Sequence, residues 1–432
     1  TGNSYHYTMK GGWSLNLPKT TIALDLEGGY GGNKRKGEMN YKETRSVAGG
    51  SPVTEDYRSI DDYDNDENIG LGSLAVQHKF NDKGHELSGS AYYKYGGHAL
   101  EYFFNDLMSL EGQRQQGHRA YEAEHRETMR INLDYALPFG KGGRLEAGYQ
   151  YYSYLEDGDY NMEWWDPKGQ TFFWRDDIYN TFYFQEGVNS IYTILSHTWK
   201  NLEAQAGVRG EHTHTVLRSS VEGADRTKNR FEFFPSVHLG YTFPNEHRLL
   251  ASYSRRTTRP QLFYMEPYIT YRDFYTAEIG NPDIRPEYIN SFELNYRKSF
   301  GENTVSATAF HRYRKDKIER LRVPYSAGVT LDSMANVGHD YSTGIELSVS
   351  LHPVRWWNTT VNGNVYHYKV KNEQAAGGNT TSSTNYDILW NNLFNLGKYT
   401  RIQLDGSFVG PSVTTQGRTD AYWYANVAVR QQ

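Results

Sequence analysis

The fold is decided by residues 248–297, which read RLLASYSRRTTRPQLFYMEPYITYRDFYTAEIGNPDIRPEYINSFELNYR. Apolar and polar residues alternate at the start of this stretch (248–256) and again at its end (291–297), which is the period of a half-buried strand. Proline cannot donate a hydrogen bond to a sheet, so the first strand should end at Pro260 and the second should begin just after Pro286. The stretch therefore predicts two paired strands joined by a long ordered excursion.

The same alternation recurs outward from this stretch along the whole chain. Tight turns rich in Gly, Pro, Asn and Lys separate the alternating runs, at residues 18–20, 81–84, 140–143, 200–201, 244–246, 301–303, near 353 and at 397–398. With a last strand at 421–430, this rhythm predicts about seventeen strands, joined alternately by tight turns and long polar loops. A soluble sandwich would show strands of about five or six residues without that alternation. We therefore expect an all-β protein, a large antiparallel up-and-down transmembrane β-barrel with short periplasmic turns and long extracellular loops.

Aromatic residues mark one end of these hairpins. They stand just before or after the tight turns: Phe80, Phe139, Trp199, Phe243, Phe300, Trp356 and Trp357. Amphipathic rings gather at membrane interfaces, so these residues predict a girdle at the short-turn end of a barrel.

The composition fits this interpretation. Hydrophobic residues make up only 37% of the chain, whereas aromatic residues make up 15% and include 37 tyrosines. A barrel strand has one apolar face, so a small share of hydrophobic residues together with many tyrosines is typical of such proteins. No apolar run is long enough for a transmembrane helix. The net charge of −5 gives no basic surface for nucleic acid, and the absence of cysteine removes disulfides and thiolate metal sites.

The central stretch also resembles a known family. It resembles a signature of TonB-dependent outer-membrane receptors at Ser252–Arg256, Arg259-Pro260 and Pro267, followed by Gly280-Asn-Pro-Asp283 and Pro286-Glu287. The resemblance is closest to the Bacteroidetes-type group, which includes SusC-related importers. The resemblance implies an outer-membrane location and a barrel of about 22 strands. It also implies a structural role for Arg256, Arg259, Pro260, Gly280, Asn281, Pro282, Asp283, Pro286 and Glu287, in ordering the loop and contacting a plug.

The resemblance implies further parts and partners. We expect residues 1–432 to form a partial barrel domain, with the plug, the TonB-contacting region, the first strands and the last strands outside it. The expected partners are outer-membrane lipid, the TonB complex through the N-terminal region, a surface lipoprotein, and a nutrient such as a glycan, a peptide or a metal chelate. No nucleic acid and no cofactor is expected.

The strongest candidate for ligand contact is the predicted loop at 155–186, which is rich in aromatic residues. Exposed rings there can stack on sugars or grip peptide side chains, with Trp164, Trp165, Trp174 and Tyr179 as the candidate residues. The alternative is that these rings extend an upper girdle or pack the loops together.

Other polar groups suggest weaker hypotheses. Residues 61–67 (DDYDNDE) offer clustered carboxylates for Ca²⁺ or form a solvated acidic loop, and His212 and His214 share one side of a strand without an identifiable third metal ligand. Glu266, Glu278, Asp283 and Glu287 are conceivable as the carboxylates of a glycosidase, although loop ordering is the simpler interpretation. No phosphate-binding glycine loop or nucleophile elbow is present, so no catalytic residue and no metal site is predicted.

Three functional hypotheses remain open at this point. The first is a TonB-dependent receptor barrel that mediates nutrient uptake and is not an enzyme. The second is a barrel that serves adhesion or surface-protein assembly without transport. The third is a soluble all-β carbohydrate-active enzyme. The first assigns ligand selection to the loops and passage to the polar interior strands.

Overall fold

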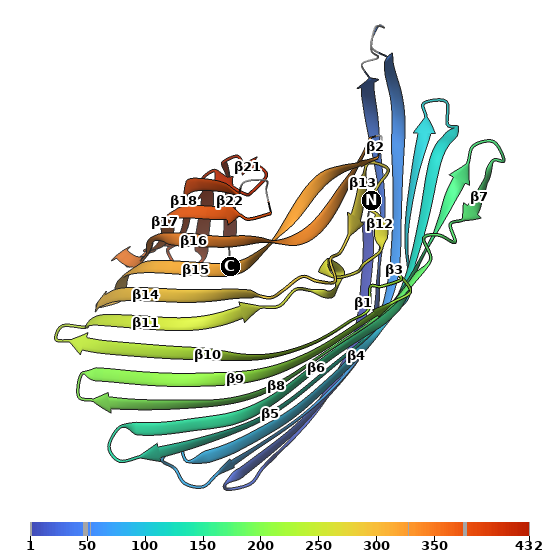
Figure 1. The fold of residues 1–432 in the computed structure, drawn as a ribbon. Coiled ribbons are helices and arrows are strands. Elements are labelled where there is room, and N and C mark those ends of the chain that lie inside the picture. The colour runs from blue at the N-terminus through green and yellow to red at the C-terminus, as the bar shows by residue number, and fades with distance from the viewer. Residues whose placement is uncertain (1, 46–50, 52, 327, 375–377, 432) are drawn as a thin grey trace.

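The protein forms one long curved wall of antiparallel strands (Figure 1), seen in a computed structural model that describes residues 2–45, 51, 53–326, 328–374 and 378–431. Each wall strand pairs with the next wall strand in sequence, as expected of an up-and-down sheet. Within the described residues there are seventeen of them: β1 (Gly2–Asn16), β2 (Thr20–Arg45), β3 (Val53–Lys79), β4 (Glu86–Ser109), β5 (Arg114–Phe139), β6 (Gly143–Asp166), β8 (Asn180–Trp199), β9 (Leu202–Ser219), β10 (Arg226–Phe243), β11 (His247–Thr258), β14 (Glu287–Phe300), β15 (Asn303–Ser326), β16 (Val329–Val354), β17 (Trp357–Asn372), β18 (Asn379–Leu396), β19 (Thr400–Val409) and β22 (Tyr422–Gln431).

The remaining elements are short and lie in the connections between wall strands. They are β7 (Thr171–Trp174), the 3-10 helix η1 (Leu262–Tyr264), β12 (Ile269–Tyr271), β13 (Thr276–Ile279), β20 (Ser412–Val413) and β21 (Arg418–Thr419). Among the described residues, no helix is long and apolar enough to cross a membrane.

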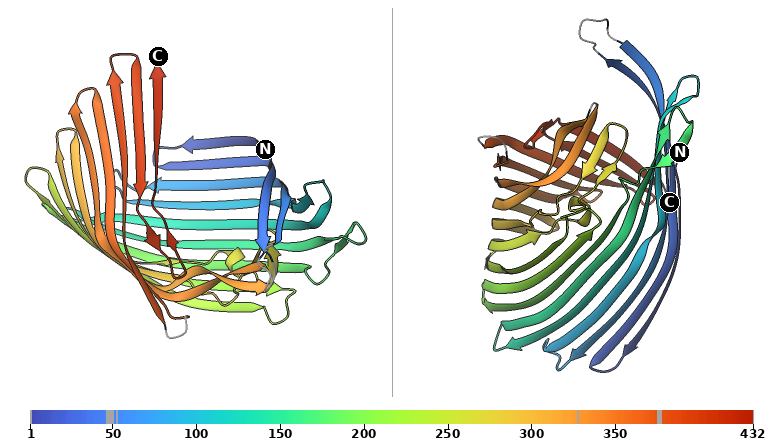
Figure 2. Two further views of the ribbon diagram at one scale, coloured as in Figure 1. Left: turned by 90° about the horizontal axis from the view of Figure 1, so that it is seen from above. Right: turned by 45° about the vertical axis from the view of Figure 1, so that its right-hand side comes forward.

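The wall curls around an interior, and β1 and β22 form its two edges (Figure 2). The described part of β1 pairs only with β2, and that of β22 pairs only with β19. The predicted all-β, up-and-down architecture of about seventeen strands is confirmed.

Alternate side chains of each strand face opposite sides of the wall, and the apolar set faces outward. Leu239 of β10 is 50% exposed and stands opposite Ala251, while Phe292 of β14 is 50% exposed and stands opposite Tyr253. Side chains at the intervening positions, such as Ser252 and Ser254, face the interior. The two faces thus have the polarity of a wall between lipid and a wet interior.

The aromatic residues beside the tight turns lie on the surface of the wall at one end, which we call the short-turn end. Phe80, Phe139, Trp199, Phe243, Phe300 and Trp356 are all exposed there, as a membrane-interface girdle requires. We call the opposite end the far end.

Several connections at the far end are shorter than predicted, whereas the connection between β11 and β14 is long, as predicted. The strands themselves continue to this end: β2 has 26 residues and β3 has 27, so residues 61–67 lie within β3 rather than in a loop. Most of the predicted loop at 155–186 likewise belongs to β6 and β8. Beyond the bilayer both faces of a strand meet water, so the alternation that marks a strand in sequence fades although its backbone pairing continues.

Candidate functional site

The connection between β11 and β14, residues 259–286, folds into the interior of the wall (Figure 1), and we call it the inner connection. Its strand β13 pairs in parallel with β16, with Thr276 opposite Thr330. On the other side of the interior its Phe274 ring lies 4.2 Å from the His118 ring of β5. The inner connection therefore bridges parts of the wall that are far apart in sequence.

Charged side chains fix the two ends of the inner connection to the wall. Arg259 donates to the Glu211 carboxylate of β9 at 2.5 Å. Near the other end, Arg226 of β10 donates twice to Asp283, at 2.7 and 2.9 Å, and holds the pKa of that carboxyl below its usual range. Lys228 donates to the carbonyl oxygen of Pro282 at 2.7 Å.

Gly280 and Asn281 hold the middle of the inner connection closed. The Gly280 amide donates to the carbonyl of Glu266 at 2.7 Å, and the Asn281 amide donates to the carbonyl of Tyr264 at 2.7 Å. A Cβ at Gly280 would come closer than 3.0 Å to the backbone of Glu266. Only glycine fits this approach without a backbone shift.

The boundaries of the flanking strands match the sequence prediction. Pairing between β11 and β14 stops at Thr258 and Glu287, between Pro260 and the fully buried Pro286. The Glu287 carboxylate accepts a hydrogen bond from the Ile318 amide at 2.7 Å, which ties the start of β14 to β15. Arg256 is exposed and shares the interior side of β11 with Ser252 and Ser254.

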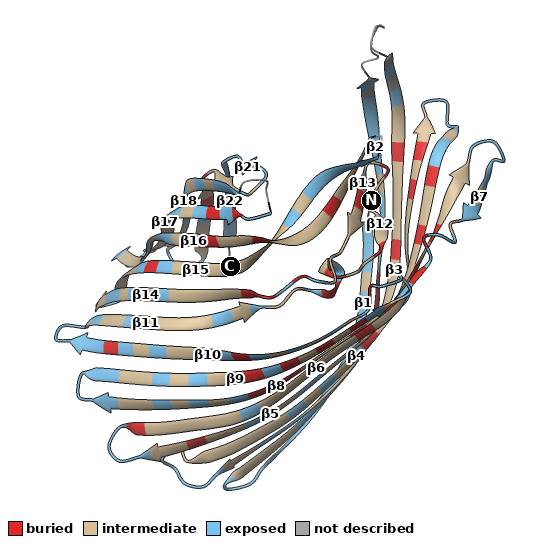
Figure 3. Ribbon diagram, viewed as in Figure 1, coloured by how far each residue is buried: buried red, intermediate tan, exposed pale blue. Residues whose placement is uncertain are grey.

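A dry cluster lies between the inner connection and the far halves of the nearby strands, where the buried segments gather in Figure 3. Met162 of β6 is only 1% exposed at its centre. Its buried members are Ala120, Tyr160, Met162, Ile178, Phe182, Phe184, Leu217, Leu262, Met265, Tyr268 and Ile284. Of the four residues predicted to contact a ligand, Trp164 packs against this cluster.

The four predicted ligand-contact residues do not share one cavity. Trp164 packs on His118 with ring centroids 4.8 Å apart and lies under the Arg175 guanidinium at 4.0 Å. Trp165 instead packs on Phe172, with ring centroids 5.2 Å apart. Trp174 and Tyr179 are about half exposed at the far end. Trp174 also packs on Tyr121, with ring centroids 5.4 Å apart, but both of these last rings keep an exposed surface that can meet a ligand.

A pocket of about 400 Å³ lies between the inner connection and strands β5, β6 and β8, and we call it the inner pocket. The sequence does not reveal this pocket, because its residues come from separate strands. It is lined by Glu124, Arg126, Tyr152, Tyr154, Glu156, Phe184, Glu186, Pro260, Gln261, Leu262, Phe263 and Glu266. The sequence signal that could have indicated this pocket is the recurrence of glutamates at interior-facing positions of successive strands.

The charges of the inner pocket are only partly compensated. Arg126 donates to Glu156 at 2.8 Å and also pairs with Glu124. Arg259 lies 3.9 Å from Glu186. Among the described residues, none donates to or pairs with the Glu266 carboxylate; burial and the charges of Glu124 and Glu156 raise its pKa to about 8. The pocket therefore presents carboxylate oxygens beside an apolar surface.

The other polar candidates have protein partners. Asp64 accepts hydrogen bonds from Lys34 and Tyr102, each at 2.6 Å, so the acidic run of β3 is part of a sheet network and the loop interpretation is wrong. His212 and His214 face outward from β9, and His214 bonds to Asn229 at 2.9 Å. Glu278 pairs with Arg272 at 2.5 Å. Within the residues that the structure describes, no group of three or more His, Asp and Glu is arranged to hold a metal.

Comparison with known proteins decides the family. Residues 78–432 match the model of the outer membrane protein beta-barrel family. The chain belongs to this family. Its location is accordingly the bacterial outer membrane, and the outward apolar face of the wall contacts lipid. No curated protein matches the sequence significantly.

Solved structures with the same fold are receptors and transporters of low sequence identity. The siderophore receptor PiuA from Acinetobacter baumannii is 11% identical, with 99% of this chain and 73% of that chain covered and a TM-score of 0.61. The ferric citrate transporter FecA in its unliganded form is 12% identical, with 99% and 68% covered and a TM-score of 0.61. The copper transporter OprC is 9% identical, with 99% and 71% covered and a TM-score of 0.56. At these identities the likeness shows the fold of TonB-dependent receptor barrels.

Proposed function

We propose that this chain is the barrel of a TonB-dependent receptor that takes up a nutrient across the outer membrane and performs no covalent chemistry. The observation that carries the proposal is the inner pocket, a partly charged cavity on the interior side of an outer-membrane wall. Ligand sites combine an apolar lining with a few convergent polar groups, and this pocket has both. The resemblance of residues 248–297 to the receptor signature adds support.

In this proposal the ligand enters from the far end, where Trp174 and Tyr179 offer exposed rings, and then reaches the inner pocket. The signature residues, from Arg256 to Glu287, act structurally by fixing the inner connection. In this proposal residues 1–432 supply part of the barrel wall together with the inner connection, and they cover 68% of FecA and 73% of PiuA. The plug and the segment that contacts TonB belong to the remainder of such a receptor, and a surface lipoprotein is a further partner at the far end.

Uptake by cells tests this proposal. Cells with the full-length protein and cells deleted for it are supplied with labelled oligosaccharides, peptides and ferric chelates, each with and without a protonophore. We expect one class to accumulate only with the protein and only while the membrane is energised. Cell-surface binding without energy-dependent accumulation would contradict the proposal and favour an adhesion barrel.

A further inference from the structure

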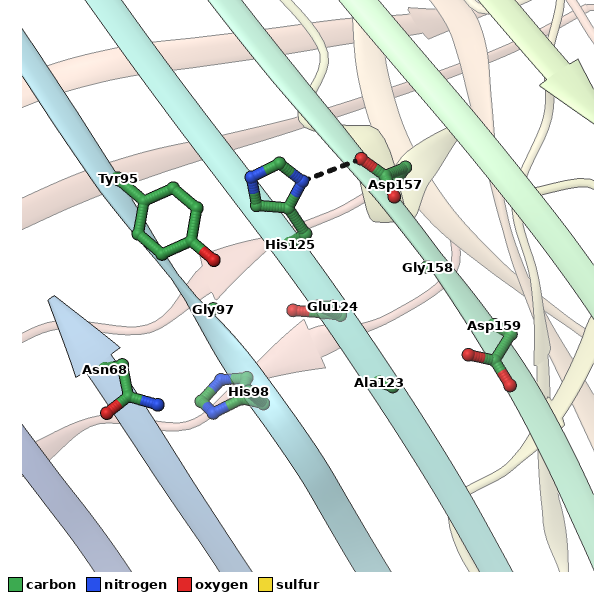
Figure 4. Close-up of a pocket in the computed structure, with 10 residues that line it drawn as sticks. All are labelled: Asn68, Tyr95, Gly97, His98, Ala123, Glu124, His125, Asp157, Gly158 and Asp159. Carbon is green, nitrogen blue, oxygen red and sulfur yellow. Dashed lines mark hydrogen bonds and ion pairs between the residues drawn. The ribbon is translucent and has the colours of Figure 1, made fainter.

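The outer face of the wall carries a second cavity, on the opposite face from the inner pocket. It measures about 460 Å³ and spans β3 to β6 (Figure 4), and we call it the outer hollow. Its side-chain lining on the outer face comes from Asn68, Tyr95, His125, Asp157 and Asp159. His98, Glu124 and Gly158 also border the hollow, but they occupy the alternate strand positions, which belong to the interior side.

The strand register places this lining on the lipid-facing side. Gly97 stands opposite His125, and His125 stands opposite Asp157, so the three positions form one row across β4, β5 and β6. Tyr95 lies two residues before Gly97 on the same face of β4 and is 47% exposed. Figure 4 shows Tyr95, His125 and Asp157 projecting from the same face of the sheet.

Small residues make the hollow. Gly97 and Ala123 occupy positions of the outer face where larger residues would fill the space. A Cβ at Gly97 would come closer than 3.0 Å to the backbone oxygen of Glu124, so β4 and β5 approach closely there. The register of β4 on β5 shifts just beyond, between His98 and Glu101, and such irregularities increase the local twist of a sheet.

The chemistry of the lining is that of sugar recognition. Asp157 accepts from His125 at 3.0 Å and keeps a second carboxylate oxygen, and no described residue donates to or pairs with the Asp159 carboxylate. Carboxylates accept hydrogen bonds from vicinal hydroxyls, the exposed Asn68 amide both donates and accepts, and the Tyr95 ring offers an apolar face. No described lysine or arginine lines the hollow, so it has no cation to bind a phosphate.

The position of the hollow along the strands makes it accessible both from the bilayer and from the surrounding water. It lies just beyond Tyr93 and Met129, two exposed outward apolar residues of β4 and β5. An apolar band is about 25 Å tall, so this level corresponds to the outer boundary of the bilayer. We infer that the outer hollow binds the ring of a neutral sugar through its vicinal hydroxyls, presented by an outer-leaflet glycolipid or by a soluble saccharide.

Binding to the full-length protein in detergent or lipid nanodiscs tests this inference. The soluble probes are methyl α-mannoside and lactose, with glucose 6-phosphate as the charged comparison, observed by saturation-transfer NMR. The glycolipid probe is monogalactosyl diacylglycerol, an uncharged glycolipid, whose retention in nanodiscs is measured by mass spectrometry. The test variants are Tyr95→Ala, Asp159→Asn and the hollow-filling Ala123→Leu. Tyr93→Ala, two residues away on the same face, and Asp82→Asn, at a short turn, are the matched controls.

We expect at least one neutral probe to bind and each test variant to weaken that binding by about tenfold or more, with the controls unchanged. If the test variants lose binding of a soluble probe, the ligand is a saccharide; if they lose binding of the uncharged glycolipid alone, the ligand is a glycolipid. Preference for glucose 6-phosphate, absence of binding by every neutral probe, or equal binding by the test variants would overturn the inference. A heat-modifiable gel shift verifies folding; if Tyr95→Ala fails to fold, Asp159→Asn and Ala123→Leu decide the outcome.

Discussion

At the scale of single residues, Gly280 decides whether the inner connection can close. Gly280→Ala places a methyl group against the Glu266 backbone, so the two amide hydrogen bonds at Gly280 and Asn281 cannot both persist. We expect residues 259–286 to become at least tenfold more susceptible to limited proteolysis while the wall stays folded. Gly28→Ala, at a site with nothing within 4 Å of the added atom, is the control. Equal protease resistance of both variants would contradict this role.

Glu266 makes the same segment sensitive to pH. Its pKa is raised to about 8, so the folded protein holds a proton that the unfolded chain releases near pH 4.5. The contribution of Glu266 to the stability of the inner connection is therefore fully present below about pH 4.5 and is lost as the pH rises through about 8. We expect amide hydrogen exchange in residues 262–281, corrected for intrinsic rates, to accelerate over this interval. Glu266→Gln should flatten the profile, and an unchanged profile in the variant would refute the assignment.

At the scale of elements, the two anchors of the inner connection differ in burial. Arg259 meets Glu211, which is 6% exposed, whereas Arg226 meets the exposed Asp283. Hydrogen bonds to a buried charge contribute about 2 kcal/mol, and exposed ion pairs contribute about 0.5 kcal/mol. We expect Arg259→Met to raise protease sensitivity in the inner connection more than Asp283→Asn does. The reverse order would show that the exposed pair is the principal anchor.

The parallel pairing of β13 with β16 offers a direct test of whether the inner connection must move. Thr276 and Thr330 are register partners, and the chain has no cysteine, so Thr276→Cys with Thr330→Cys creates one defined pair. We expect oxidation to link them and, under the proposed function, to lower uptake several-fold until a reductant is added. Each single-cysteine variant is the control. Full uptake by the oxidised double variant would mean that ligand passes without movement of β13.

At the scale of the whole molecule, the outward apolar face should tolerate charge least. Leu239 lies four residues from the girdle residue Phe243, near the middle of the apolar band, and the neighbouring His238 faces the interior. An arginine facing lipid near the midplane costs about 2–4 kcal/mol. We expect Leu239→Arg to lower the urea midpoint for unfolding in lipid vesicles and His238→Arg to change it little. Equal effects would contradict the assignment of the two faces.

The sequence predicts the wall better than it predicts what fills the interior. Alternation such as Leu249, Ala251 and Tyr253 identifies strands because one face meets lipid, and Pro260 and Pro286 mark the strand ends correctly. The inner pocket was not foreseen because Glu124 and Glu186 belong to different strands, and only the pairing register of β5, β6 and β8 brings them to one surface. The local alternation of apolar and polar residues indicates which segments form strands and which side of the sheet each side chain faces. It does not indicate which residues of different strands lie close together in the interior.

The continuation of β2 and β3 to 26 and 27 residues has an evolutionary consequence. At about 3.3 Å per residue and a tilt near 40°, such strands rise roughly 65 Å, well beyond an apolar band of about 25 Å. A single inserted residue in this projecting part would exchange its inward and outward side chains. Variation in the surface seen by phage or antibodies should therefore accumulate as substitutions, as paired insertions, or at the tips of the hairpins.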